Sequence, residues 1–343
     1  MIACHSSKAA RLSMVAIVAL LTLAPATASG GNVQPYRLFP WLYFHASDAP
    51  EAQLDRPAYG PGLPVHGESS TGDGETADES ERKFARLPII AGKQVIAFYG
   101  KPGSVSMGIL GEYSKESLAP LLEGYARLYD QNNGPLGVVP AFHIVYGTVW
   151  PEGEIGLLKS SVVEEYVKFA AERGWAVILD HQIGKYSVEE AVRALLPFLR
   201  YPNVHLALDP EWRTPRPMKE IGTISGDEIN TAQKMIDDYL RDNGLPGIRL
   251  LVVHQFTAKM ISGRESVRAD FDRVVLVHNA DGFGSPALKR QSYAFNALAT
   301  NMPVKGFKLF FQSKVPGAGS DVPLMKPEDV LALDPLPLLI MYQ

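Results

Sequence analysis

The sequence has almost no cysteine and no excess of basic residues. Cys4 is the only cysteine among 343 residues, so no disulfide framework is available and the fold must depend on its hydrophobic core. Lysine and arginine number 33 against 37 aspartate and glutamate, which gives a net charge of −4. Nucleic-acid-binding proteins usually carry an excess of positive charge, which this sequence does not have, so we expect no nucleic-acid partner.

Motifs of several nucleotide-binding and hydrolytic classes are also missing. After the first apolar run, YGKPGS (99–104) only weakly imitates a glycine-rich phosphate loop. No GxSxG motif occurs, and the nearest stretch, GSVSMG (103–108), lacks the strand-to-helix context of a serine nucleophile. No HExxH helix is present either. The sequence therefore gives no reason to expect a cofactor.

Long hydrophobic runs are absent, and the most apolar one lies near the N-terminus. The run MVAIVALLTLAP (14–25) falls short of the roughly 20 residues that span a bilayer. Lys8 and Arg11 precede it and Ala26-Thr27-Ala28 follows, the three-part pattern of a secretory signal peptide. We expect cleavage after residues 1–28, a mature chain without a membrane span, and a secreted, periplasmic or cell-surface location. The alternative is a membrane anchor.

Residues 29–92 read as a low-complexity linker. The tract HGESSTGDGETADESERK (66–83) is acidic, rich in serine and glycine, and has no apolar periodicity, which predicts disorder. The exception is YRLFPWLYF (36–44), whose aromatic side chains would expose much apolar surface to water. This segment either packs on the following domain as a strap or remains an adhesive surface segment.

From residue 93 onward, apolar runs rich in β-branched and aromatic residues alternate with amphipathic stretches. Capping boxes are expected at Ser161 with Glu164, Ser187 with Glu190, and Ser225 with Glu228, and Ser285-Pro286 predicts another helix start. Near-continuous apolar runs suit parallel strands that are covered on both faces. Eight of them over about 250 residues predict a single (β/α)8 barrel at 93–343, with an open doubly wound sheet as the alternative. The runs are 94–100, 137–147, 175–180, 203–209, 248–256, 273–281, 306–312 and 337–343.

Polar side chains gather at the C-terminal ends of these runs, which is where such barrels carry their sites. The fourth run, NVHLALDPEWRTP (203–215), ends in two carboxylates separated by a proline. Side-chain alternation predicts that Leu206 and Leu208 face the helices, while Asp209 and Glu211 face the barrel interior. The strand-end polar residues are Tyr99, His143, Tyr146, Asp180, His181, Gln182, Asp209, Glu211, His254, Gln255, His278, Asn279, Asp281, Lys308, Gln312 and Tyr342.

Two converging carboxylates suit cleavage of a glycosidic bond, in which one acid protonates the leaving oxygen and another acts as nucleophile or activates water. Glu211 is the predicted proton donor, with Asp209, Asp180 or Asp281 as its partner. An inward Lys308 would keep a nearby aspartate ionised and so separate the two pKa values. Predicted substrate contacts are Trp212, Tyr99, Tyr146 and Tyr342 as sugar platforms, and His254, Gln255, His278, Asp281, Lys308 and Gln312 as site-shaping residues.

Three other interpretations of the strand ends remain open. A buried aspartate paired with Lys308, and an Asp209-Pro210 turn, are also ordinary structural features. A non-catalytic barrel would bind carbohydrate in the same cleft. A metal-dependent hydrolase of a phosphodiester or amide would use strand-end side chains as ligands. Its candidate ligands are His143, His181, His254, His278, Asp180, Asp209 and Asp281.

The residues LALDPEW (206–212) and the closing LIMYQ (339–343) resemble the (β/α)8 glycoside-hydrolase superfamily. In particular they are similar to the lysozyme-type muramidases, whose fourth strand ends in Asp-x-Glu. The resemblance implies Glu211 as proton donor, Asp209 as its electrostatic or nucleophilic neighbour, and a polysaccharide or peptidoglycan-like substrate. Those muramidases also carry an aspartate at the end of the first strand, where this sequence has FYGKPGS (98–104).

Overall fold

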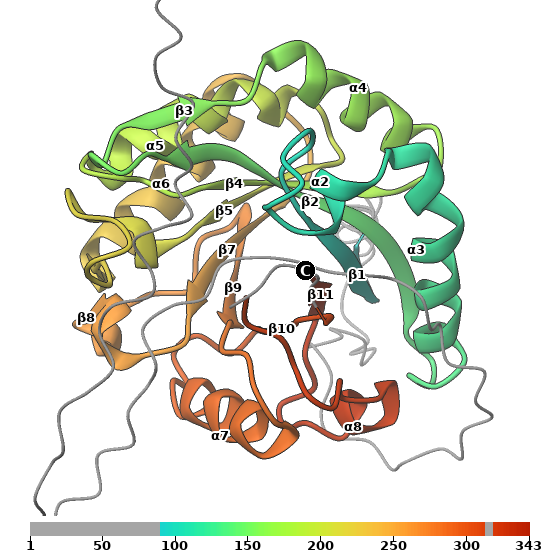
Figure 1. The fold of residues 1–343 in the computed structure, drawn as a ribbon. Helices are drawn as coiled ribbons and strands as arrows, with labels where there is room; N and C mark the ends of the chain where they lie inside the picture. Colours follow the sequence, from blue (N-terminus) through green and yellow to red (C-terminus); the bar gives the residue numbers. More distant parts are fainter. Residues whose placement is uncertain (1–89, 313–317) are drawn as a thin grey trace, which may run out of the picture. The chain divides into compact units, whose positions relative to one another are not determined.

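The computed structural model describes residues 90–312 and 318–343, and in them eight parallel strands close into a barrel (Figure 1). The barrel order is β1-β11-β10-β9-β7-β5-β4-β2, and pairing of β1 with β2 completes the circle. This confirms the predicted (β/α)8 fold. The strands are β1 (Lys93–Gly100), β2 (Gly137–Val149), β4 (Ala176–His181), β5 (Val204–Leu208), β7 (Arg249–Gln255), β9 (Val274–Ala280), β10 (Lys305–Leu309) and β11 (Leu339–Tyr342).

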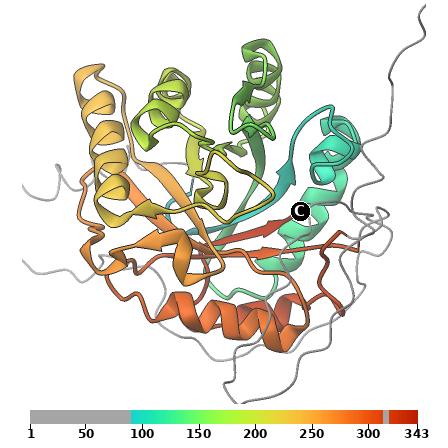
Figure 2. The same ribbon diagram turned by 60° about the vertical axis from the view of Figure 1, so that its left-hand side comes forward.

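Helices follow the strands and cover the outside of the barrel (Figures 1 and 2). They are α2 (Ile109–Glu112), α3 (Lys115–Asp130), α4 (Ser160–Ala171), α5 (Val188–Leu195), α6 (Gly226–Asp242), α7 (Pro286–Ala297) and α8 (Pro327–Leu331). Shorter elements are the strands β3 (Ile155–Leu157), β6 (Ile224–Ser225) and β8 (Ile261–Ser262), and the 3₁₀ turns η1 (Leu196–Arg200), η2 (Pro210–Trp212), η3 (Ala258–Met260) and η4 (Arg264–Ser266).

Local capping explains where several helices begin. The predicted capping boxes of Ser187 before α5 and Ser225 before α6 both form. The Ser285 side chain accepts the Leu288 amide ahead of α7. The prediction for α4 is wrong, because Ser161 lies inside that helix: its N-cap is Lys159, two residues earlier, and no side chain caps it.

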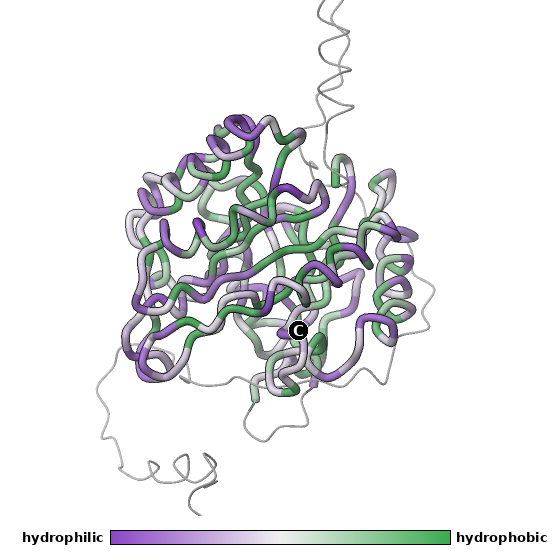
Figure 3. Tube along the Cα trace, turned by 90° about the horizontal axis from the view of Figure 1, so that it is seen from above, coloured by the Kyte–Doolittle hydropathy of each residue, from purple (hydrophilic) through white to green (hydrophobic). Residues whose placement is uncertain are grey.

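Alternating residues of each strand divide the core into two layers. Small and β-branched side chains such as Val95, Ala141 and Ala207 fill the barrel interior. Larger apolar residues, including Leu206 and Leu208, face the helices as predicted. Figure 3 shows the result as hydrophobic strands surrounded by helices of mixed hydropathy. The period-2 pattern of the sequence therefore determines which strand residues can reach the interior.

The predicted signal peptide (1–28), most of the predicted linker (29–92) and the aromatic segment (36–44) lie outside the described residues. Ile90 is buried with the interior layer, three residues before β1 begins. Within 90–312 and 318–343, no helix combines the length and apolar character needed to cross a bilayer.

Candidate active site

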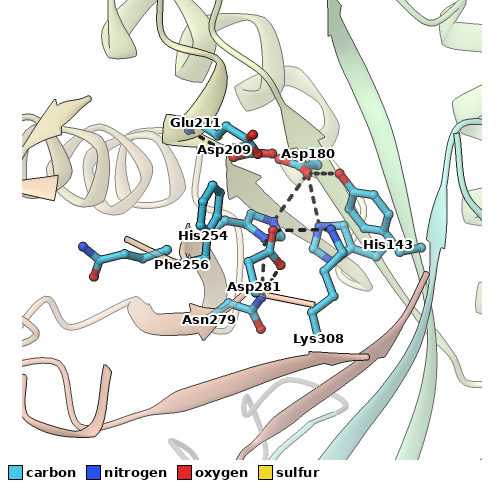
Figure 4. Close-up of polar contacts among 12 residues, drawn as sticks. His143, Asp180, Asp209, Glu211, His254, Phe256, Asn279, Asp281 and Lys308 are labelled. Atoms are coloured by element: carbon cyan, nitrogen blue, oxygen red, sulfur yellow. Dashed lines mark hydrogen bonds and ion pairs between the residues drawn. The ribbon is translucent and has the colours of Figure 1, made fainter. Parts of the chain in front are cut away.

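A polar layer closes the barrel interior at the C-terminal ends of the strands (Figure 4). Every barrel strand except β11 contributes one of its members, either within the strand or directly after it. Their side chains are buried, with at most 5% of any residue exposed. The members are Tyr99, His143, Asp180, Asp209, His254, Asp281 and Lys308.

His254 lies between two carboxylates. Its Nδ1 is 3.1 Å from Asp281 Oδ1, and its Nε2 is 3.5 Å from Asp180 Oδ2. Burial favours the neutral imidazole, but Asp281 and Asp180 outweigh it and raise the pKa of His254 to about 10. In the protein without other bound charges, His254 is therefore an imidazolium that bridges the two acids.

Asp180 is ionised in this arrangement. Burial opposes its charge, but His254 and then His143 lower its pKa to about 2. The Tyr99 hydroxyl donates to Asp180 Oδ2 over 2.9 Å, which also stabilises the carboxylate. His143 Nε2 lies 3.8 Å from the same oxygen, and burial lowers the pKa of His143 to about 3, so this imidazole is neutral.

Asp281 is the second ionised carboxylate of the layer. Asn279 Nδ2 donates to its Oδ1 over 3.0 Å, and Lys308 Nζ is 3.4 Å from its Oδ2. Burial opposes ionisation, but Lys308 and His254 lower the pKa of Asp281 well below its usual range. Lys308 also lies 3.8 Å above the ring of Tyr99, so its ammonium contacts both an anion and a π face.

Asp209 and Glu211 have pKa values shifted in the opposite direction. Burial, together with the charges of Asp180 and Asp281, raises the pKa of Asp209 to about 7. Burial and the neighbouring Asp209 and Asp281 raise the pKa of Glu211 well above its ordinary value. The layer therefore holds two carboxyls that favour the protonated form beside two that stay ionised. Acid and base roles require such a difference between the pKa values of neighbouring carboxyls.

The turn η2 holds Glu211 beside Asp209. The Glu211 amide donates to Asp209 Oδ1 over 3.2 Å, and the Gly222 amide donates to the Glu211 carbonyl over 2.6 Å. A Cβ at Gly222 would lie 2.4 Å from the Pro210 carbonyl oxygen, so only glycine permits this contact. Arg213 bonds to Glu228 of α6 and anchors the far side of the turn.

Glu211 is only partly buried, unlike the other carboxyls of the group. Among the described residues, no ion pair forms with its carboxylate. Figure 4 shows it next to Asp209 and Asp180, on the opposite side of the cluster from Lys308. Glu211 is therefore the acid of this group that combines solvent access with a raised pKa.

Four predicted substrate contacts lie on the outer face of the barrel instead of in its mouth. Gln255 and His278 bond to each other over 2.7 Å between the strands and the helices. Tyr146 packs against Phe198, and the Tyr342 hydroxyl bonds to Tyr129 of α3 over 2.7 Å. Each directly precedes or follows an inward position, so alternation turns it outward.

The remaining predicted contacts divide between the site and its margins. Tyr99, His254, Asp281 and Lys308 lie in the polar layer, and their contact with a substrate stays a prediction. Trp212 is buried and so offers little surface to a sugar, and Gln312 is exposed beyond the end of β10 instead of pointing inward. His181 lies on the outer face of β4, where it accepts the Ile183 amide.

His143 and Asn279 belong to the site but were not among the predicted catalytic or substrate-binding residues. His143 was predicted only as a metal ligand of the alternative hydrolase. A stricter use of alternation would have found both. Ala141 faces the interior of β2, which places His143 inward two residues later, and Val277 does the same for Asn279 in β9.

No protein-family model and no curated protein matches this chain. Among solved structures, an oxaloacetate acetylhydrolase with bound oxalate is 13% identical, covers 76% of this chain and 79% of its own, and has a TM-score of 0.45. A family 18 chitinase from Crocus vernus is 10% identical (73% and 92% covered, TM-score 0.37). An endo-beta-1,4-glucanase from Xanthomonas axonopodis pv. citri is 13% identical (73% and 88%, TM-score 0.38). Such distant similarity does not indicate which reaction this chain performs.

Proposed function

We propose that this protein is a glycoside hydrolase in which Glu211 protonates the leaving oxygen and Asp209 is its carboxylate partner. The observation that carries the proposal is the placement of Glu211, which follows a barrel strand and keeps some exposure to solvent. Its carboxylate forms no ion pair with the described residues, and its backbone amide donates to Asp209 Oδ1. A general acid must reach solvent or substrate and must hold its proton near neutral pH.

Asp209 supplies the complementary charge. After burial, the largest influence on the pKa of Asp209 is the imidazolium of His254, which lowers it, whereas the largest influence on the pKa of Glu211 is the charge of Asp209, which raises it. We therefore infer that the pair releases its first proton from Asp209. Above neutral pH the pair then carries one proton and one negative charge. The negative charge stabilises the positive charge that develops on a sugar ring in the transition state.

Asp180 takes a supporting role in this mechanism. It was the third predicted catalytic residue, but it is completely buried and bonded to Tyr99. Its negative charge raises the pKa of Asp209, and so it helps to retain the proton of the pair.

The substrate class follows from the chemistry and from the predicted location. A chain that is exported by residues 1–28 would meet extracellular polysaccharide or cell-wall glycan, and we propose these as substrates. The test is hydrolysis of a panel of peptidoglycan, chitin, cellulose and related polysaccharides by the full-length protein, by its Glu211→Gln variant and by Glu265→Gln.

Glu265 lies in the turn η4 on the protein surface and serves as the matched control. We expect the wild type and Glu265→Gln to release reducing sugar equally, and Glu211→Gln to be slower by about 10²- to 10⁴-fold, the usual contribution of a general acid. Equal rates for Glu211→Gln and the wild type would refute the assignment. Binding of a glycan without any turnover would show that the barrel is a recognition module.

A further inference from the structure

Three side chains of the polar layer lie at the spacing of metal ligands. One nitrogen from each of His143 and His254 and one oxygen of Asp180 all lie within 4.8 Å of one another. We propose that these three residues bind a divalent transition-metal ion such as Zn²⁺ inside the barrel. This site goes beyond the reaction assigned to Glu211; in the metal-bound protein the ion would replace the proton of His254 as the positive charge near Asp209.

The separations agree with coordination around a single ion. His143 Nε2 and His254 Nε2 lie 3.8 and 3.5 Å from Asp180 Oδ2. Nitrogen and oxygen ligands about 2.1 Å from a tetrahedral ion are about 3.4 Å apart. These two separations are close to that value, and the nitrogens of the two histidines lie within 4.8 Å of each other. Two imidazoles with one carboxylate form an ordinary ligand set for Zn²⁺ and Fe²⁺.

Several polar atoms of these three side chains have no hydrogen-bond partner among the described protein groups. This is the case for both ring nitrogens of His143, for His254 Nε2 and for Asp180 Oδ1, although all three side chains are 0% exposed. Buried polar atoms are nearly always paired. A single coordinated ion, with its own water or substrate ligand, would give these unpaired atoms a partner.

The surrounding side chains already orient the ligands. Asp281 lies 3.1 Å from His254 Nδ1 and so places the hydrogen on that nitrogen, which leaves the Nε2 lone pair facing Asp180 and His143. Asn279 holds Asp281 in place, and Tyr99 holds Asp180. Metal-binding histidines almost always donate their second ring nitrogen to such a carboxylate.

The local charge also suits a dication. Three buried carboxylates, those of Asp180, Asp209 and Asp281, face one ammonium, that of Lys308. With neutral histidines and ionised acids, the three negative charges and one positive charge leave an excess of two negative charges. A divalent ion would neutralise this excess.

The experiment measures metal binding without any substrate. Full-length protein is unfolded with chelator and refolded free of metal, because ligands with no exposed surface load most readily during folding. Zn²⁺ and Co²⁺ are then titrated by calorimetry, and the visible spectrum of the Co²⁺ form is recorded. We expect one ion per chain, the absorption bands of Co²⁺ in a low-symmetry site of four or five ligands, and a higher Tm with metal.

Two variants and one control test the ligand assignment. His143→Gln removes a ligand and should abolish stoichiometric binding. Asp281→Asn leaves all three ligands in place but changes the group that orients His254, and it should weaken affinity by about 10- to 100-fold. His205→Gln changes another fully buried histidine, which lies outside the cluster and accepts the Leu250 amide, and should bind metal as the wild type does. Circular dichroism verifies that each variant is folded.

Wild-type protein that binds no ion, or a folded His143→Gln variant that binds as tightly as the wild type, would overturn the proposal. Either result would leave the polar layer as a proton-balanced network in which the His254 imidazolium bridges Asp180 and Asp281. Neither result would bear on Glu211, because no hydrolysis is measured.

Discussion

Replacing Asp209 with asparagine should stabilise the protein, and the gain should grow with pH. Burial raises the pKa of Asp209 from 3.8 to about 7. Because the folded protein holds this proton more tightly than the unfolded chain does, ionisation opposes folding as the pH rises from about 4 to about 7, and the loss is complete above that range. The Asp209→Asn side chain would have no such penalty, and its amide oxygen could still accept the Glu211 amide in place of Oδ1.

The size of the expected stabilisation follows from the shift in the pKa of Asp209. About three pKa units correspond to about 4 kcal/mol at pH 8, whereas at pH 5 the loss is only about 2 kcal/mol, because the pH has crossed only part of the interval between the two pKa values. Urea unfolding of Asp209→Asn and wild type at both pH values, with chelator present, should therefore show a gain in the free energy of unfolding that is about 2 to 3 kcal/mol larger at pH 8.

Asp242→Asn is the control for this measurement, because Asp242 is exposed at the end of α6. It should change stability by less than about 0.5 kcal/mol at either pH. The reasoning would be refuted if Asp209→Asn had the same effect at pH 5 as at pH 8, since burial of a titrating carboxyl would then not be the cause.

Two further substitutions test the packing that supports the site. Leu206→Ala should lower the free energy of unfolding by about 2 to 5 kcal/mol, because it leaves a cavity between β5 and the helices. Leu298→Ala on the surface is the control and should change it by less than about 0.5 kcal/mol. Similar losses for the two variants in urea unfolding would contradict the assignment of the core. Asp321→Ala should destabilise by about 3 to 5 kcal/mol, because it removes the carboxylate 3.4 Å from the buried ammonium of Lys289 and leaves it only the carbonyl oxygens of Gly282 and Lys308. A loss below about 1 kcal/mol in the same assay would show that this ion pair does not secure the chain after β10.

Much of the fold could be predicted from the sequence, because each barrel strand is an apolar run bounded by turn residues. All eight predicted runs became strands of the closed barrel. The two capping boxes at Ser187 and Ser225 formed because serine and glutamate three residues apart satisfy each other's backbone amides locally. Such signals need no knowledge of distant contacts.

The site could be predicted only in part, because most candidates were chosen for lying near the end of a strand, without asking whether the side chain faces the barrel interior or the helices. Asp209 and Lys308 face the barrel interior, as side-chain alternation predicted, and His254 lies in the same polar layer. Gln255 and His278 also end strands but face the helices, where they bond to each other. The contact of Lys289 with Asp321 joins residues from separate loops and helices, and no local pattern reveals it.

The measurement that tests the central claim most directly compares leaving groups. Once a hydrolysed glycan is known, kcat/KM is measured for its aryl glycosides, from poor leaving groups such as phenol to activated ones such as dinitrophenol, with wild-type protein and Glu211→Gln. A general acid matters only where the leaving oxygen needs a proton. We therefore expect Glu211→Gln to lose about 10²- to 10⁴-fold on the phenyl glycoside and almost nothing on the dinitrophenyl glycoside. An equal loss on both substrates would contradict the role of Glu211 as proton donor.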